Sequence, residues 1–183
     1  MNIFLKKIEN EVQALIFLGF GLFLSLSLLS YLPTDPSFNS MGQGWKTVNY
    51  CGLIGSFTAD GIFQVFGLMA WMIVAAFFHA AWISFRGTKV NFKDIRHVVA
   101  VIIVACLAAL ASIYWPNTKL YSGQIYPGGL IGLGFSTVLM KILNSAGAQI
   151  LLFTAVSVLS ALYFEVRPSQ ILRPLHLDRK SVV

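Results

Sequence analysis

The chain has 183 residues, of which 57% are apolar and only 11% are charged. A soluble globular domain is about 45–50% apolar and about 25% charged. This composition, with a mean hydropathy of +0.75, excludes a typical soluble enzyme and a disordered chain, and it predicts a membrane protein.

Four stretches without Lys, Arg, Asp or Glu are long enough to cross a membrane. In chain order they are residues 12–32, 61–85, 98–115 and 142–164. Each holds 18 to 25 residues, and about 20 apolar residues cross the roughly 30 Å hydrocarbon core. We therefore predict an all-α membrane protein, with a bundle of four transmembrane helices forming one domain over residues 1–164.

A further uncharged stretch precedes the last span. Pro127, Gly128 and Gly129 interrupt it, and these residue types break helices. The eleven residues that follow, 130–140, are too few for a span,. We predict a short re-entrant or interfacial helix there, in the outer loop.

The charges predict the orientation of the spans. The net charge is +6, and ten of the thirteen Lys and Arg lie before the first span, between the second and third, or after the fourth. The other two loops hold only Lys46, Lys119 and Lys141. Cytoplasmic loops carry the excess of basic residues, so we expect both termini in the cytoplasm. Residues 165–183 would begin a basic cytoplasmic linker, and the inner face would attract anionic lipid.

Aromatic residues near the ends of the spans agree with this topology. Tyr31, Tyr114 and Trp115 close spans on the outer side, whereas Trp82 and Tyr163 close spans on the inner side. Tyr and Trp are enriched at both membrane interfaces, so we expect these five rings at headgroup level.

Few residues offer catalytic chemistry. Two cysteines, Cys51 and Cys106, provide neither a disulfide framework nor a zinc site,. The segment 41–47 resembles a phosphate loop, but Trp45 stands where the loop needs glycine before its lysine,. We predict no catalytic, cofactor-binding or metal-ligating residue. An intramembrane enzyme that uses Cys106 with His79 stays open as an alternative.

Three polar side chains near or within the spans have structural interpretations. His79 lies deep in the second span, where we favour an interhelix hydrogen bond over a proton relay. Asp35 is predicted to cap a turn after the first span. Asp60 directly precedes the predicted second span, where the positive end of the helix dipole would stabilise its carboxylate. Small residues along the spans suit close packing, either in a bundle or in an oligomer.

The order of several short motifs resembles the amino-terminal four-span domain of the FtsK/SpoIIIE family of DNA translocases, from about Leu15 to Phe164. The motifs are Leu28-Leu29-Ser30-Tyr31, Asp35-Pro36-Ser37, Asn49 with Gly52 and Gly55, Ala59-Asp60-Gly61-Ile62-Phe63, Gly67, Gly128-Gly129-Leu130-Ile131-Gly132 and Asn144-Ser145-Ala146-Gly147.

The resemblance implies a membrane anchor at the division septum of a bacterial inner membrane. Members of this family couple cell division to chromosome segregation, and an ATP-driven carboxy-terminal motor pumps DNA. Their membrane domain forms oligomers and contacts division proteins. No phosphate loop, Walker B acid or DNA-reading domain occurs before Val183. We therefore expect no ATPase activity here and contact with DNA only through a separate motor domain; a fragment and a stand-alone anchor both stay open.

The leading hypothesis is an oligomerising anchor that recruits septal division proteins, with no cofactor. A small membrane channel or transporter is the alternative, because the break before residue 130 resembles the interrupted helices of transporters. The candidate interaction or structural positions are Asp35, Pro36, Asn49, Gly55, Asp60, Gly67, His79, Gly128, Gly129, Gly132 and Gly147.

Overall fold

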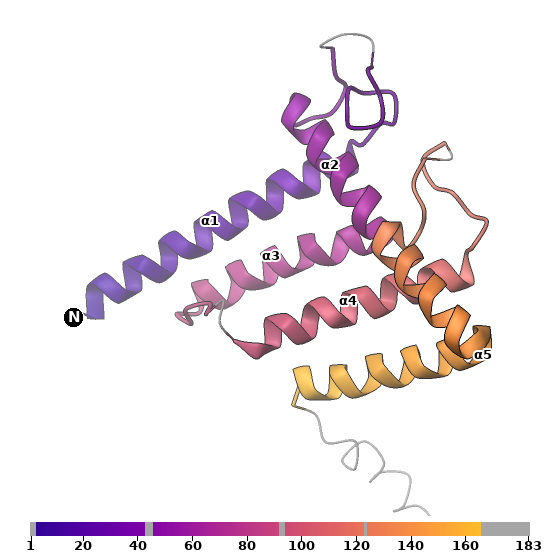
Figure 1. The fold of residues 1–183 in the computed structure, drawn as a ribbon. Coiled ribbons are helices and arrows are strands. Elements are labelled where there is room, and N and C mark those ends of the chain that lie inside the picture. The colour runs from indigo at the N-terminus through magenta and orange to yellow at the C-terminus, as the bar shows by residue number, and fades with distance from the viewer. Residues whose placement is uncertain (1–2, 43–45, 92–93, 123, 166–183) are drawn as a thin grey trace, which may run out of the picture.

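The computed structural model describes residues 3–42, 46–91, 94–122 and 124–165 (Figure 1). The elements in this part of the chain are α1 (Ile3–Leu29), α2 (Gly52–Phe66), the 3-10 helix η1 (Gly67–Met69), α3 (Ala70–Phe85), α4 (Ile95–Tyr114) and α5 (Gly129–Tyr163). Four helical segments of the described chain are long and apolar enough to cross a membrane. The predicted all-α, four-span fold class is therefore confirmed.

The spans pack as two pairs. Helix α1 lies along α3, and α4 lies along α5, whereas α3 and α4 make almost no contact with each other. Side chains of α1 and α3 meet around Phe17 and Ala81. Cys106, Leu110 and Leu152 fill the contact between α4 and α5. The two pairs need another connection, and it lies at one end of the molecule.

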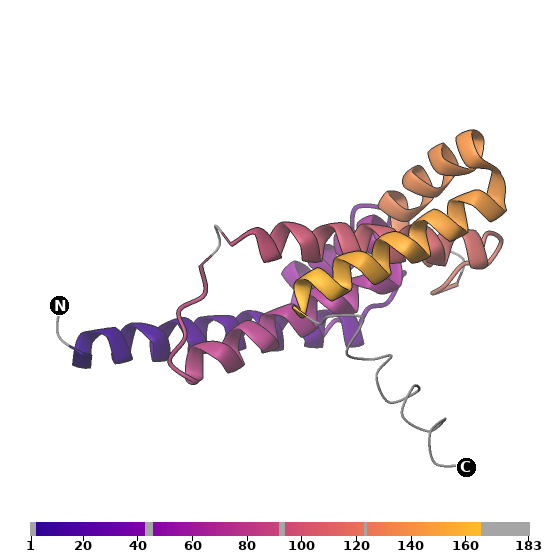
Figure 2. The same cartoon turned by 90° about the horizontal axis from the view of Figure 1, so that it is seen from below.

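We call this end the loop end; it comprises residues 30–42 and 46–51, α2, η1, residues 115–122 and 124–128, and the first half of α5. Figure 1 shows α2 and the first half of α5 running across the ends of the other helices. The opposite end, which we call the terminal end, holds the start of α1, residues 85–91 and 94–95, and the end of α5. Figure 2 shows the start of α4 separated from α1 and α3 at this terminal end.

The second predicted span, residues 61–85, is not one continuous helix. It crosses η1, where Gly67 adopts a φ of 57° and a ψ of −134°. Only α3, with 16 residues, runs beside α1, and at 1.5 Å per residue it is about 24 Å long. Hydropathy missed the break because the residues on both sides of it are apolar.

Helix α5 contains the predicted short helix and the last span. They are separated at Asn144, which has φ 57° and ψ 176° and kinks the helix. Residues other than glycine rarely adopt a positive φ with a ψ near 180°. The short helix covers residues 129–143 and the final straight segment covers 145–163, instead of the expected 130–140 and 142–164.

The other element bounds differ in smaller ways. Helix α1 ends at Leu29, before the expected end of the first span at residue 32, and its apolar segment is Lys7–Leu29. Helix α4 begins at Ile95 because Asp94 caps it, accepting a hydrogen bond from the Arg96 amide at 3.0 Å,. Of the expected linker 165–183, all but Glu165 lies outside the described residues.

Candidate interaction site at the loop end

A buried carboxylate lies at the centre of the loop end. Asp60 is fully buried in the middle of α2, and its Oδ1 accepts a hydrogen bond from the Tyr31 hydroxyl at 2.9 Å. The Gln64 amide lies 3.5 Å from the same oxygen, whereas Oδ2 has no protein partner. The expected capping role of Asp60 is wrong, because the helix begins eight residues earlier, at Gly52.

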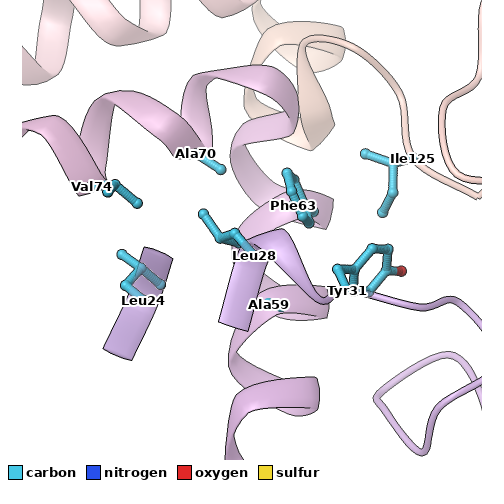
Figure 3. Packing of buried hydrophobic residues seen from close by; sticks show 8 residues of the cluster. All are labelled: Leu24, Leu28, Tyr31, Ala59, Phe63, Ala70, Val74 and Ile125. Atoms are coloured by element: carbon cyan, nitrogen blue, oxygen red, sulfur yellow. The ribbon is translucent and has the colours of Figure 1, made fainter. Parts of the chain in front are cut away.

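Tyr31 joins this carboxylate to the apolar core. Its ring packs on Phe63 and meets Tyr121 edge to face, with centroids 5.2 and 5.1 Å away. Figure 3 shows Tyr31 and Phe63 beside Ile125, which comes from the loop before α5. Burial, and then the hydrogen bond to Asp60, raise the pKa of Tyr31, so the phenol keeps its donor proton,. Only 6% of Tyr31 is exposed, so its ring packs inside the protein; its expected depth at headgroup level stays a prediction.

Asp35 closes the loop between α1 and α2. Its two carboxylate oxygens accept hydrogen bonds from the Val48 and Asn49 amides at 3.0 and 2.9 Å. Only 3% of Asp35 is exposed, and charged acceptors make the stronger hydrogen bonds. Asp35 therefore joins the two ends of a loop of about a dozen residues. The sequence predicts only that it caps a local turn. The neighbouring Pro36 carbonyl accepts from the Ser56 hydroxyl at 2.5 Å.

Asn49 fixes the start of α2 against the end of α1. Its side-chain amide donates to the Ser27 carbonyl at 2.8 Å, and its Oδ1 accepts from the Cys51 amide at 3.0 Å. A Cβ added to Gly55 would overlap Asn49 Oδ1 and lie 3.1 Å from Ser27 Oγ. Gly55 thus permits a close approach of α2 to α1.

A glycine junction of Gly67, Gly128, Gly129 and Gly132 connects the two helix pairs. Gly67 and Gly129 both have positive φ, at 57° and 62°, and a Cβ on either would overlap the backbone near the other. The Leu68 amide donates to the Pro127 carbonyl across this contact at 2.8 Å. Because backbone fills the junction, the two helix breaks do not enclose space for a solute between Gly67 and Gly129.

Gly128 and Gly132 bring the start of α5 onto α4. A Cβ on either would overlap the Ala108 carbonyl, and Ser112 Oγ lies nearby. Small residues at a crossing let helix backbones approach closely. The junction therefore joins α2, η1, α4 and α5 through backbone contacts, the kind of contact that side-chain substitution tolerates least.

The outward face of the loop end is apolar. Met41, Tyr50 and Ile54 are strongly exposed. An open cavity of about 650 Å³ lies between Phe38 and Leu53. The Phe38 ring contacts Phe57 of α2 edge to face, with centroids 5.1 Å apart. We name the apolar residues that line this cavity or are strongly exposed near it in the chain the loop patch (Phe38, Met41, Tyr50, Leu53, Ile54 and Phe57). Exposed apolar side chains suit contact with another apolar surface.

Two candidate positions lie apart from this network. A Cβ on Gly147 would meet only Leu143 of its own helix, at 3.1 Å. His79 is exposed on α3, and among the described residues it has no interhelix hydrogen bond, in contrast to the expectation. Cys106 is buried between α4 and α5, so the structure does not bring it to His79. No described group of three or more His, Cys, Asp or Glu is placed to hold a metal ion.

The sequence did not identify several residues that contact the candidate positions at the loop end. The missed contacts are those of Ser27, Ser56, Ala108, Ser112 and Tyr121. Each is a small or aromatic residue in an apolar stretch, where its type alone gives no signal.

The sequence matches the family described as "4TM region of DNA translocase FtsK/SpoIIIE" over residues 6–175. This chain belongs to that family. Its relatives include proteins named DNA translocase FtsK from three bacteria. The Rickettsia prowazekii protein is 31% identical over 147 residues, which are 79% of this chain and 19% of the relative. The Rickettsia typhi protein is 32% identical over 74% of this chain and 18% of the relative.

The FtsK of Vibrio vulnificus is 28% identical over 73% of this chain and 14% of its own length. The chain therefore spans less than a fifth of each of these relatives, and the part that it matches is the membrane region rather than the ATPase motor. No solved structure matches it significantly. With its four span-like helices, the chain is a multi-pass membrane protein that corresponds to the membrane-anchoring domain of FtsK.

Proposed function

We propose that this chain is the oligomerising, partner-recruiting anchor of an FtsK-like DNA translocase in a bacterial inner membrane. The observation that carries the proposal is the division of the molecule into a rigid loop end and a basic terminal end. Lys89 and Arg96 lie at the terminal end, beside the connection between α3 and α4. The positive-inside rule then places the terminal end in the cytoplasm, next to anionic lipid.

The loop end would face outward and recruit septal division proteins. Its loop patch is apolar, and Asp35 and Asn49 fix the segments behind it. A rigid scaffold under an exposed apolar patch keeps the ordering cost of binding small. The anchor itself performs no catalysis and binds no cofactor in this proposal. ATP hydrolysis and contact with DNA would belong to a motor domain.

Fluorescence imaging of dividing cells tests this function. The full chain, fused to a fluorescent protein and expressed in a bacterium that carries its own division proteins, should form a band at mid-cell. The double variant Met41→Ser/Tyr50→Ser should stay in the membrane but lose the band, because it removes apolar surface without touching Asp35 or Asn49. Trp115→Ser, an exposed aromatic change in the other connection of the loop end, is the matched control and should keep the band.

A uniform membrane signal from the unaltered chain would contradict the recruiting function. Orientation is tested separately by reporter fusions after Glu165 and within residues 46–50. The proposal requires cytoplasmic signal from the first fusion and outer signal from the second. The reverse assignment would contradict it.

A further inference from the structure

His79 occupies an unusual position for an ionisable side chain. It lies six residues before the end of α3 at Phe85, or about 9 Å along the helix, in a segment apolar enough to span a membrane. It is exposed on the face of α3 opposite Ala70, Val74 and Ala81, which are buried. Exposure of an imidazole to hydrocarbon without a hydrogen-bond partner costs free energy. A polar side chain on a neighbouring helix would reduce this cost.

The second half of α5 offers such a neighbour on another copy. Its buried side packs on α4 through Leu152 and also holds the buried Ala148, and the opposite side exposes Thr154 and Ser157. Ser157 lies six residues before the end of α5 at Tyr163, so it sits as far from its helix end as His79 does. Its hydroxyl donates to the Phe153 carbonyl at 2.8 Å, which leaves its oxygen free to accept an N–H.

The two faces also agree in shape and direction. Ala75 and Ala76 lie one turn before His79 and are exposed with it. Small residues let another helix approach closely. Helices α3 and the second half of α5 both run from the loop end to the terminal end (Figure 1), so they would pair in parallel with matching depths.

We propose that α3 of one copy packs against residues 145–163 of the next copy, with His79 donating a hydrogen bond to Ser157 of the partner subunit. This interface rests on the oligomerising part of the proposed function and specifies its surface. The two contacting faces differ, so the contact is head to tail, and repeated copies close into a ring or extend as a filament.

Disulfide cross-linking between two single-cysteine populations tests the interface. In a Cys51→Ser/Cys106→Ala background, one population carries Ala76→Cys and the other Thr154→Cys. Each is nine residues before its helix end. Oxidation in mixed membranes should give a cross-linked dimer, and either population alone should give none. Dimers from Ala76→Cys alone, or no dimer from the mixture, would overturn the head-to-tail contact.

Association of the full chain in lipid nanodiscs gives the second measurement. His79→Leu should weaken it about three- to tenfold, the range expected for one interhelix hydrogen bond in a membrane. His79→Gln, which keeps an N–H donor, should restore most of it. Leu22→Ala, at an exposed position of α1, should leave it unchanged.

The outcomes separate this interface from the function on which it rests. If the chain oligomerises and His79→Leu has no effect, the interface is wrong while the oligomerising anchor stands. If the unaltered chain is a monomer in membranes, the oligomerising function and the interface both fail.

Discussion

Different kinds of contact hold the loop end and the terminal end of this molecule together. At the loop end, Tyr31, Asp35 and Asn49 make buried hydrogen bonds, and four glycines bring backbones into contact. At the terminal end, one hydrogen bond joins the side-chain amide of the buried Asn10 to the Gly87 carbonyl at 2.8 Å. Other links there are exposed ion pairs, such as Glu9 with Lys89, 3.4 Å apart, and Arg96 with Glu165. Buried polar contacts are costly to break, whereas exposed ion pairs contribute little. Stability should therefore concentrate at the loop end.

The largest expected effect comes from the glycine junction. Gly67→Ala or Gly129→Ala should destabilise the fold by about 1–3 kcal/mol through overlap and by about a further 1–2 kcal/mol through the positive φ. Gly19→Ala and Gly134→Ala are the matched controls, since a Cβ there meets nothing within 4 Å. Thermal unfolding in detergent micelles measures all four. Equal unfolding temperatures for the junction variants and the controls would contradict the account.

The Asp35 loop closure should have the next largest effect. Asp35→Ala removes the side-chain acceptor of the Val48 amide and leaves the buried Asn49 amide only Thr47 Oγ1, 3.1 Å away; it should cost about 1–3 kcal/mol. Asp35→Asn keeps one acceptor oxygen and should lose less. Hydrogen exchange at the Val48 and Asn49 amides gives the local readout. Protection that survives in Asp35→Ala would show that other contacts hold this loop.

Substitution of Tyr31 should lower the free energy of unfolding by a smaller amount, and this loss should depend on pH. Its pKa is raised in the folded state by burial and by Asp60, so its contribution to stability is complete below the ordinary tyrosine pKa of about 10. That contribution is lost as the pH rises through the higher folded value. Tyr31→Phe should cost about 1 kcal/mol at neutral pH, because Asp60 Oδ1 loses the Tyr31 donor and keeps only the Gln64 amide, 3.5 Å away,.

An ultraviolet titration checks the pH behaviour. The phenolate signal of Tyr31 should appear only at the alkaline unfolding transition, and Tyr31→Phe should remove it. Tyr50→Phe, which alters a largely exposed ring, should leave both stability and that late signal intact. A Tyr31 signal that rises together with the signal of Tyr50 would contradict its burial.

The smallest effect belongs to the terminal end. Lys89→Ala removes an exposed ion pair with Glu9, and it should change the free energy of unfolding by less than about 1 kcal/mol. High salt should reduce even this difference. A loss as large as that of Asp35→Ala would remove the contrast between the two ends.

Particular residues show what the sequence could and could not predict. The four apolar stretches predicted the span-like helices because hydropathy depends only on composition over about 20 residues. The breaks at Gly67 and Asn144 depend on single backbone conformations, which hydropathy does not register. Asp35, Asn49, Gly55 and Gly129 were selected as candidates, but their partners lie 13 or more residues away or on other helices. Such pairings require the tertiary fold.

Pulsed electron paramagnetic resonance on the full chain in nanodiscs tests the contrast between the ends most directly. In a Cys51→Ser/Cys106→Ala background, one spin-label pair replaces Ile54 and Leu130 at the loop end, and another replaces Arg86 and Ile95 at the terminal end; all four positions are exposed. The account predicts a narrow distance distribution for the first pair and a clearly broader one for the second. A loop-end distribution as broad as the terminal-end one would contradict the claim that the glycine junction fixes the two helix pairs to each other.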